Sequence, residues 1–381
     1  MKKLLLIFII GSYFAQAQSL YNKNYTLSIG ANTTLFVADS IINNGTIINN
    51  GDIQVGGIWQ NNATYEPGTG QLTLTSNQTQ TINHNDQSFT RLTISGGGKK
   101  IFGADITIED ELVLNDGILS SSGTSKIIIE EGAAISGGSE TSFIEGPLYH
   151  TGTGDKYYPV GADNVYLPVE LLDIKGTNPT IGVLINMPNT NLKTAGDLEA
   201  VTDRQNWQLD VLNGMFAGAG VVLPLQDELF LDNITEAVVV QASSQNEGYY
   251  SLGGMERTGD VLAGSVTSET DATELFLTIG KFTTEPGSEI NVYNALSPNG
   301  DGINDFFKIE NIELYPNNVV LIYTRWGDKV FEQAGYDNVE NTFTGKSNVG
   351  KIRQLLEGTY YYVVEKGEGS KNENGFIVIR Y

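Results

Sequence analysis

The chain has 381 residues, no cysteine and a formal net charge of −23, from 45 acidic and 22 basic residues. The absence of cysteine excludes disulfides and thiol chemistry. The excess of negative charge excludes nucleic acid and anionic lipid as partners of the chain as a whole.

The N-terminus has the pattern of a secretory signal peptide over residues 1–17. Lys2 and Lys3 precede an apolar run at 4–14, and Ala-Gln-Ala follows at 15–17, which predicts cleavage between Ala17 and Gln18. No later run approaches the roughly 18 apolar residues of a membrane-spanning helix. We therefore expect an exported mature chain without a transmembrane helix.

Residues 18–145 are strand-like and repetitive. The segment 42–47 reads INNGTI and the next six residues, 48–53, read INNGDI. Short β-branched runs separated by Asn-Gly and Gly-Gly turns suit either a β-solenoid, in which Asn can stack on Asn between coils, or a sandwich built of hairpins. The six-residue repeat favours a β-solenoid-like region.

Residues 146–282 are richer in Tyr, Pro and Gly at first and then contain longer strand patterns at 181–185, 238–241 and 275–279. These patterns predict a central β-sandwich. Trp207 has alternating apolar neighbours, so we expect it to be a core residue. Residues 283–289 read as a linker.

Residues 290–381 predict a third all-β domain. Strand patterns at 306–309, 319–323, 329–331, 360–364 and 376–381 fit an immunoglobulin-like β-sandwich of about 90 residues. The whole chain is therefore expected to be all-β. Its charge is uneven, with a net −3 over 290–381 and −22 over 18–289.

Four motifs in this last domain occur in order: NALSPNGDGINDFFKI, LYPNNVVLIYTRWGDKVFE, LEGTYYYVV and GFIVIRY. Together they resemble the gliding-motility-associated C-terminal domain, the type B sorting domain of type IX secretion in Bacteroidota. One departure is that Phe343-Thr344-Gly345 and a basic segment, KSNVGKIRQ, stand where the family has a Trp-Asp-Gly turn.

The resemblance implies a route and partners. The chain would enter the periplasm, be recognised there by the type IX secretion machinery with an outer-membrane accessory protein, and be delivered to the outer cell surface or the medium. Residues 92–119 also resemble a recurring region of bacterial surface proteins. Since sorting domains accompany both adhesins and enzymes, they do not define the passenger's task.

The loop that opens the last domain is a candidate metal site. Asn299, Asp301 and Asp305 place oxygens around two glycines, which suits a partial Ca²⁺ loop, and calcium is the one possible cofactor. Lys308 stands where an EF-hand needs glutamate, so a complete EF-hand is excluded. The alternative is a turn closed by its own hydrogen bonds.

Catalytic patterns are weak, and we expect no catalytic residues. His84 and His150 are expected to be turn or surface residues. The acids between Asp105 and Glu111 could serve a polysaccharide-degrading enzyme. Exposed aromatic pairs, Trp59 with Tyr65 or Tyr157 with Tyr158, could instead serve a carbohydrate-binding module.

The favoured hypothesis is a secreted, non-enzymatic protein with a structural or adhesive passenger that binds a glycan or another cell-surface ligand.

Overall fold

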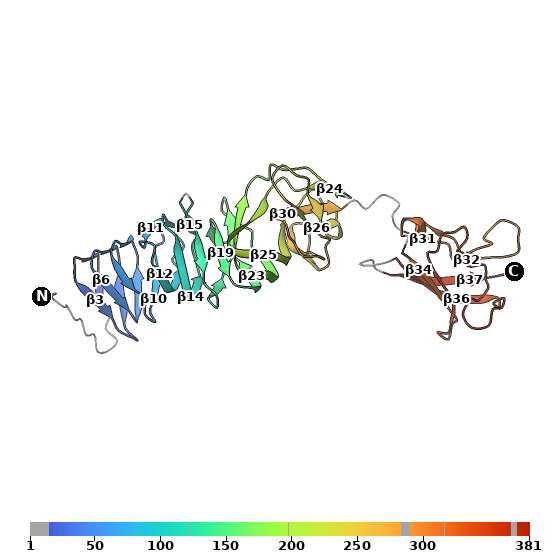
Figure 1. Ribbon diagram of the computed structural model, residues 1–381, viewed down its shortest axis with the longest axis horizontal. Helices are drawn as coiled ribbons and strands as arrows, with labels where there is room; N and C mark the ends of the chain where they lie inside the picture. Colours follow the sequence, from blue (N-terminus) through green and yellow to red (C-terminus); the bar gives the residue numbers. More distant parts are fainter. Residues whose placement is uncertain (1–14, 123, 197, 283–289, 316, 367–371) are drawn as a thin grey trace. The chain divides into compact units, whose positions relative to one another are not determined.

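The computed structural model describes residues 15–122, 124–196, 198–282, 290–315, 317–366 and 372–381. Residues 1–14 of the predicted signal peptide and the predicted linker, 283–289, lie outside these ranges. The chain divides into two compact units, Met1–Thr283 and Thr284–Tyr381 (Figure 1). Each unit is described by itself.

The first unit begins as a β-solenoid of about seven turns. Its strands stack in parallel in three sheets. Sheet B contains β2 (Leu20–Asn22), β5 (Ile41–Asn43), β8 (Trp59–Asn61), β11 (Gln80–Asn83), β13 (Lys100–Phe102), β15 (Leu119–Ser121), β18 (Ile144–Glu145) and β21 (Val160–Ala162), and closes with an antiparallel β22 (Val165–Tyr166). Sheet C contains β3 (Thr26–Ile29), β6 (Thr46–Asn49) and β9 (Thr64–Glu66).

The solenoid part of sheet A forms the remaining side of the coils. It contains β1 (Ala15–Ala17), β4 (Thr34–Val37), β7 (Asp52–Val55), β10 (Gln71–Leu74), β12 (Ser88–Ile94), β14 (Ile106–Leu114), β16 (Ile127–Ile129), β17 (Ala134–Gly137) and β19 (Leu148–Thr151). β1 immediately precedes the predicted cleavage point and pairs with β4.

The six-residue repeat corresponds to one side of a coil, and the full coil is longer. Gly45 donates its backbone N–H to Oδ1 of Asn43 at 3.1 Å, and Gly51 does the same to Asn49, also at 3.1 Å. The repeated INNG units thus build two like corners of one coil. Strand registry places Ile41 beside Trp59 in the next coil.

Asparagines stack between coils inside the solenoid. Asn22 donates from Nδ2 to Oδ1 of Asn43 at 2.7 Å, and Asn43 donates likewise to Asn61 at 2.7 Å. All three side chains are buried. The ladder pairs these amides along an otherwise aliphatic interior, although Nδ2 of Asn61 at its end has no hydrogen-bond partner among the described residues. The N-terminal solenoid is confirmed.

The second part of this unit continues sheet A. β19 pairs in parallel with β16 and in antiparallel fashion with β23. The further elements are β20 (Gly154–Tyr158), β23 (Val169–Asn186), β24 (Leu198–Val201), β25 (Asn206–Gln226), the short 3-10 helix η1 (Ile234–Glu236), β26 (Ala237–Ala242), β27 (Tyr250–Ser251), β28 (Arg257–Gly259), β29 (Ala263–Thr267) and β30 (Phe276–Phe282).

The long strand β25 organises this region. It pairs with β23 along most of its length, with β30 near Trp207 and with β29 from Val222 to Gln226. Every residue of β26 is buried, because apolar clusters lie on both of its faces. Trp207 is fully buried and donates its indole N–H to the Leu167 carbonyl at 3.0 Å, which confirms its core position.

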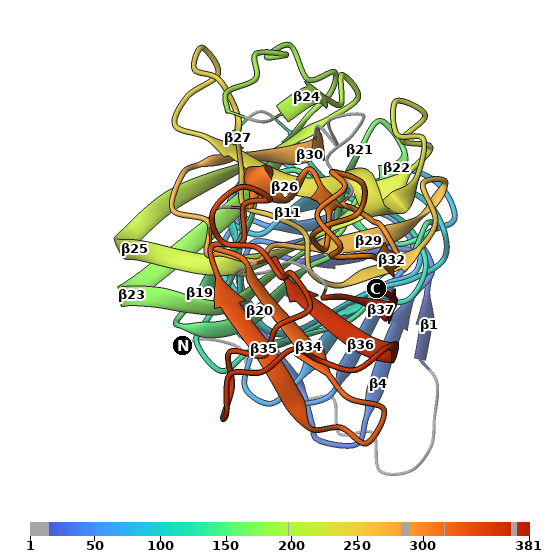
Figure 2. The same cartoon turned by 90° about the vertical axis from the view of Figure 1, so that its right-hand side faces the viewer.

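The second unit is a small all-β domain. Its five-stranded sheet has the order β32 (Ala295–Leu296), β37 (Glu373–Ile379), β36 (Gly358–Glu365), β34 (Val319–Tyr323) and β35 (Lys329–Ala334), as Figure 2 shows for β34 to β37. β31 (Asn291–Val292) pairs with β33 (Ile309–Glu310), and a 3-10 helix, η2 (Ile312–Leu314), follows. A separate apolar core supports this domain.

The all-β class is confirmed. Among the residues described, no helix has the length and apolar character needed to cross a bilayer.

Candidate functional sites

The loop at 297–305 is closed by its own hydrogen bonds. The Asp305 carboxylate accepts the backbone N–H of Gly300 through one oxygen and that of Gly302 through the other, each at 2.7 Å. Asn299 Oδ1 accepts the N–H of Asp301 at 3.0 Å. Gly300 and Gly302 have φ of +82° and +86°, a conformation that glycine adopts without strain.

These bonds bear on the predicted calcium site. Asn299 turns its amide nitrogen toward Asp301, with Nδ2 donating to Oδ2 at 3.1 Å. An amide hydrogen directed at a carboxylate suits a turn better than a shared cation, which needs oxygen on both sides. Within the described ranges, no group of three or more His, Asp or Glu side chains is placed to hold a metal ion. Calcium binding at Asn299, Asp301 and Asp305 stays a prediction.

The acids between Asp105 and Glu111 contact neighbouring coils. Asp110 accepts from Nε of Arg91 at 2.6 Å, and Asp105 pairs with Nζ of Lys126 at 3.2 Å. Glu111 accepts the Ser136 hydroxyl at 3.0 Å. Each of these carboxylates therefore links neighbouring coils of the stack.

The two lysines near these acids differ in environment. Lys99 is partly exposed and pairs with Glu145 at 2.5 Å. Lys100 is buried and donates from Nζ to the carbonyls of Ser76 at 2.6 Å and Gly98 at 2.9 Å. Burial lowers the pKa of Lys100 to about 8, against the opposing effect of Asp116. The Lys100 side chain thus links the turns at Ser76 and Gly98, which belong to neighbouring coils.

The expectation for the two histidines was wrong, because both are buried. Trp59 donates its indole N–H to Nδ1 of His84 at 3.0 Å, so Nε2 carries the proton toward the Ser88 carbonyl at 3.2 Å. His150 contacts the carbonyl of Tyr157 at 3.0 Å. Burial lowers the pKa of His84 to about 3 and that of His150 to about 4. Both imidazoles are thus neutral core groups at physiological pH.

The aromatic pairs considered for sugar binding are mostly internal. Trp59 and Tyr65 pack edge to face at 5.6 Å between ring centroids, inside the solenoid. Tyr158 is also buried and donates its hydroxyl to the Ile181 carbonyl at 3.0 Å. Tyr157 is half-buried and bonds to the Tyr166 hydroxyl. Trp59, Tyr65 and Tyr158 therefore cannot form a sugar-binding platform.

A shallow groove of about 290 Å³ lies where the solenoid meets the antiparallel strands. It is lined by residues of several elements, among them Ser120, Ser121, Glu145, Asp163 and Ile185. Glu145 is held there by Lys99 and by the Asn164 N–H, which donates to Oε1 at 3.1 Å. The groove mixes hydroxyl and carboxylate groups with one apolar wall, a combination that suits a hydroxyl-rich ligand.

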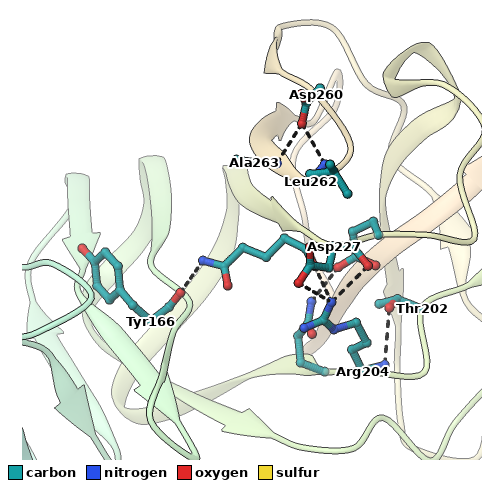
Figure 3. Close-up of polar contacts among 10 residues, drawn as sticks. Tyr166, Thr202, Arg204, Asp227, Asp260, Leu262 and Ala263 are labelled. Carbon is teal, nitrogen blue, oxygen red and sulfur yellow. Dashed lines mark hydrogen bonds and ion pairs between the residues drawn. The ribbon is translucent and has the colours of Figure 1, made fainter.

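Sequence reasoning missed a polar network at the end of β25 (Figure 3). Arg204 donates from its guanidinium to the carbonyls of Gln226 at 2.8 Å and Asp227 at 3.0 Å. The Gln226 amide reaches the Tyr166 carbonyl at 2.7 Å. Beside them, burial raises the pKa of the Glu228 carboxyl, although bonds from Thr202 and Gln205 oppose this. These residues lie apart in sequence, and no local motif marks them.

Comparison with known families identifies the C-terminal unit. Residues 290–379 match the CHU_C type IX secretion signal domain. No curated protein matches the chain significantly. No solved structure does so either.

The chain thus carries a type IX secretion signal domain, which supports export by type IX secretion, interaction with that machinery, and a secreted or cell-surface location.

Proposed function

We propose that the passenger, residues 18–282, is a non-catalytic structural or adhesive component that the C-terminal domain delivers to the cell surface. The proposal rests on one observation: the outward carboxylates of the solenoid make contacts between neighbouring coils. Those contacts stiffen a repetitive scaffold.

The enzyme alternative lacks a comparable supporting observation. Retaining glycosidases hold two carboxyl groups about 5 Å apart and inverting enzymes about 6.5–9.5 Å apart, with one carboxyl kept protonated. Among the acids considered for this role, Asp105 and Asp110 have basic partners of their own. These ion pairs give both carboxylates a structural role between neighbouring coils.

The groove beside Glu145 is the proposed place for a glycan ligand of the adhesive passenger. Its hydroxyl and carboxylate groups can exchange hydrogen bonds with sugar hydroxyls, while Ile185 offers apolar contact. The replacement of Ser120 and Ser121 by alanine would remove the hydroxyl groups without adding atoms to the groove.

Export is tested in cells that possess type IX secretion. The full chain is compared with a truncation that ends at Glu289, by fractionation and by protease shaving of intact cells. Only the full chain should reach the surface or medium. Equal export of the truncation would contradict the proposed route.

Adhesion is tested separately with the purified full chain on polysaccharide-coated and uncoated surfaces. We expect saturable retention without release of soluble sugar, and weaker retention for S120A/S121A. Release of soluble sugar that stops in D110N/E111Q would instead favour the enzyme.

A further inference from the structure

A basic loop, residues 345–356, lies in the C-terminal domain and contributes one side chain, Leu355, to its apolar core. It contains Lys346, Lys351 and Arg353 and no acidic residue, in a chain whose net charge is −23. All three cationic side chains are exposed. Among the described residues, no carboxylate lies within ion-pair distance of them.

The backbone of the basic loop is held in one conformation. The Ser347 side chain is buried, and its hydroxyl donates to the Lys351 carbonyl at 2.9 Å and accepts the Arg353 N–H at 3.1 Å. An isolated antiparallel bridge joins Lys346 to Gln354. These contacts order both sides of the loop, so its presentation carries a small entropic cost on binding.

The loop is also fixed to the rest of the domain. Asn348 exchanges two hydrogen bonds with the backbone of Glu332 in β35, at 2.8 and 2.9 Å, and thereby covers that edge strand. At the other side, the Tyr381 hydroxyl donates to the Leu355 carbonyl at 2.7 Å. Hydrogen bonds thus fix the loop to the domain on two sides.

Two aliphatic side chains of the basic loop point into solvent. Ile352 is 80% exposed and Leu356 is 82% exposed, whereas Leu355, next to Leu356 in sequence, belongs to the core at 5% exposure. Exposed aliphatic groups beside unpaired cations do not stabilise the folded domain. They are typical of a surface that a partner covers.

The charges indicate what kind of partner fits. Most of this chain repels an acidic partner. Because salt screens charges that lie more than a Debye length of about 8 Å away, a partner close to the basic loop is attracted mainly by its three cations. An anionic bilayer is a broad surface that would also meet the chain's many carboxylates. A protein with a small acidic and apolar patch meets only the loop.

We propose that the basic loop is a docking surface for a protein component of the secretion machinery, one that presents carboxylates around an apolar pocket. The inference rests on the proposed export function and assigns it to a defined part of the domain. Ile352 and Leu356 would fill the pocket, and Lys351 with its two neighbouring cations would contact the carboxylates.

The test is export of the full chain carrying K351E/I352S. The matched control is V339S/R380E, which changes an equally exposed aliphatic residue, Val339 at 80%, and another exposed cation of the same domain. The exported fraction of K351E/I352S should fall at least tenfold, while the control stays within twofold of wild type. Resistance of the purified domain to protease verifies that each variant is folded.

The outcomes separate the two proposals. If the truncation at Glu289 is retained but K351E/I352S is exported normally, the docking surface is wrong and the export function stands. Equal loss in both double variants also refutes the assignment. Salt-sensitive binding of the purified chain to phosphatidylglycerol vesicles that K351E/I352S abolishes would refute a protein partner in favour of lipid.

Discussion

Replacement of Asn43 by alanine tests whether the asparagine ladder holds the first coils together. The substitution removes two buried side-chain hydrogen bonds, one from Asn22 and one to Asn61, each of 2.7 Å. It also removes the part-buried bonds from the Gly45 N–H and to the Thr64 carbonyl, each of 3.1 Å, for which water can substitute. It also leaves Oδ1 of Asn61 without its donor. At about 1 kcal/mol for a lost bond and about 1–3 kcal/mol for a buried group left unpaired, the local free energy of unfolding should fall by roughly 3–5 kcal/mol.

Hydrogen exchange of the full chain, followed by mass spectrometry, measures this loss locally. Amides of β5, β6, β8 and β9 should exchange roughly a hundredfold to a few thousandfold faster in N43A, provided that they open by local unfolding. Asn44 is the matched control, because it makes similar contacts to Tyr21 and Asn62 at the exposed surface. N44A should change stability by about 0.5 kcal/mol or less. If these amides exchange at the same rate in N43A and N44A, the ladder does not stabilise the coils.

Three further results are expected. Because His84 and His150 have folded pKa values of about 3 and 4, below the unfolded value near 6.5, their contribution to stability is complete above pH 6.5 and is lost as the pH falls toward 4. At pH 5 each histidine should lower the free energy of unfolding by about 2 kcal/mol relative to pH 7.5. The free energy from urea unfolding should therefore depend less on pH in H84N/H150N than in the wild type, and an equal dependence would contradict the burial of these histidines. D305A should lower the melting temperature of the C-terminal domain, since two backbone N–H groups lose their acceptor, with or without calcium. A calcium-dependent rise in melting temperature that D305A abolishes would instead establish the metal site. D110N/E111Q should leave retention on polysaccharide unchanged, and a large loss would favour a carbohydrate site on that face.

Local chemistry explains why much of the fold could be predicted. In the INNG units, an Asn side chain and a Gly two residues later make a corner by themselves, so six residues of sequence define one side of a coil. The C-terminal domain was recognised for a similar reason, since its turn motifs and strands lie in a fixed order.

Features that could not be predicted from the sequence depend on contacts between residues that are distant along the chain. Nothing next to His84 in sequence indicates burial, because its partner Trp59 comes from the preceding coil. The Arg204 network likewise depends on β25 bringing Gln226 and Asp227 back beside residue 204. The length of β23 and β25 was hidden by glycines, which the structure accommodates at bulges within the strands.

The antiparallel pairing of β23 on β19 has a consequence for how such a passenger can change in length. That pairing closes the open side of the last coil, so the closing elements do not depend on how many coils precede them. Residues 41–58 form one whole coil, with one strand in each of the three sheets. A tandem duplication of this segment would lengthen the solenoid by about 4.8 Å and leave both ends unaltered. The length of the solenoid can therefore change in whole coils, by duplication in the coding sequence, without any change to the C-terminal domain.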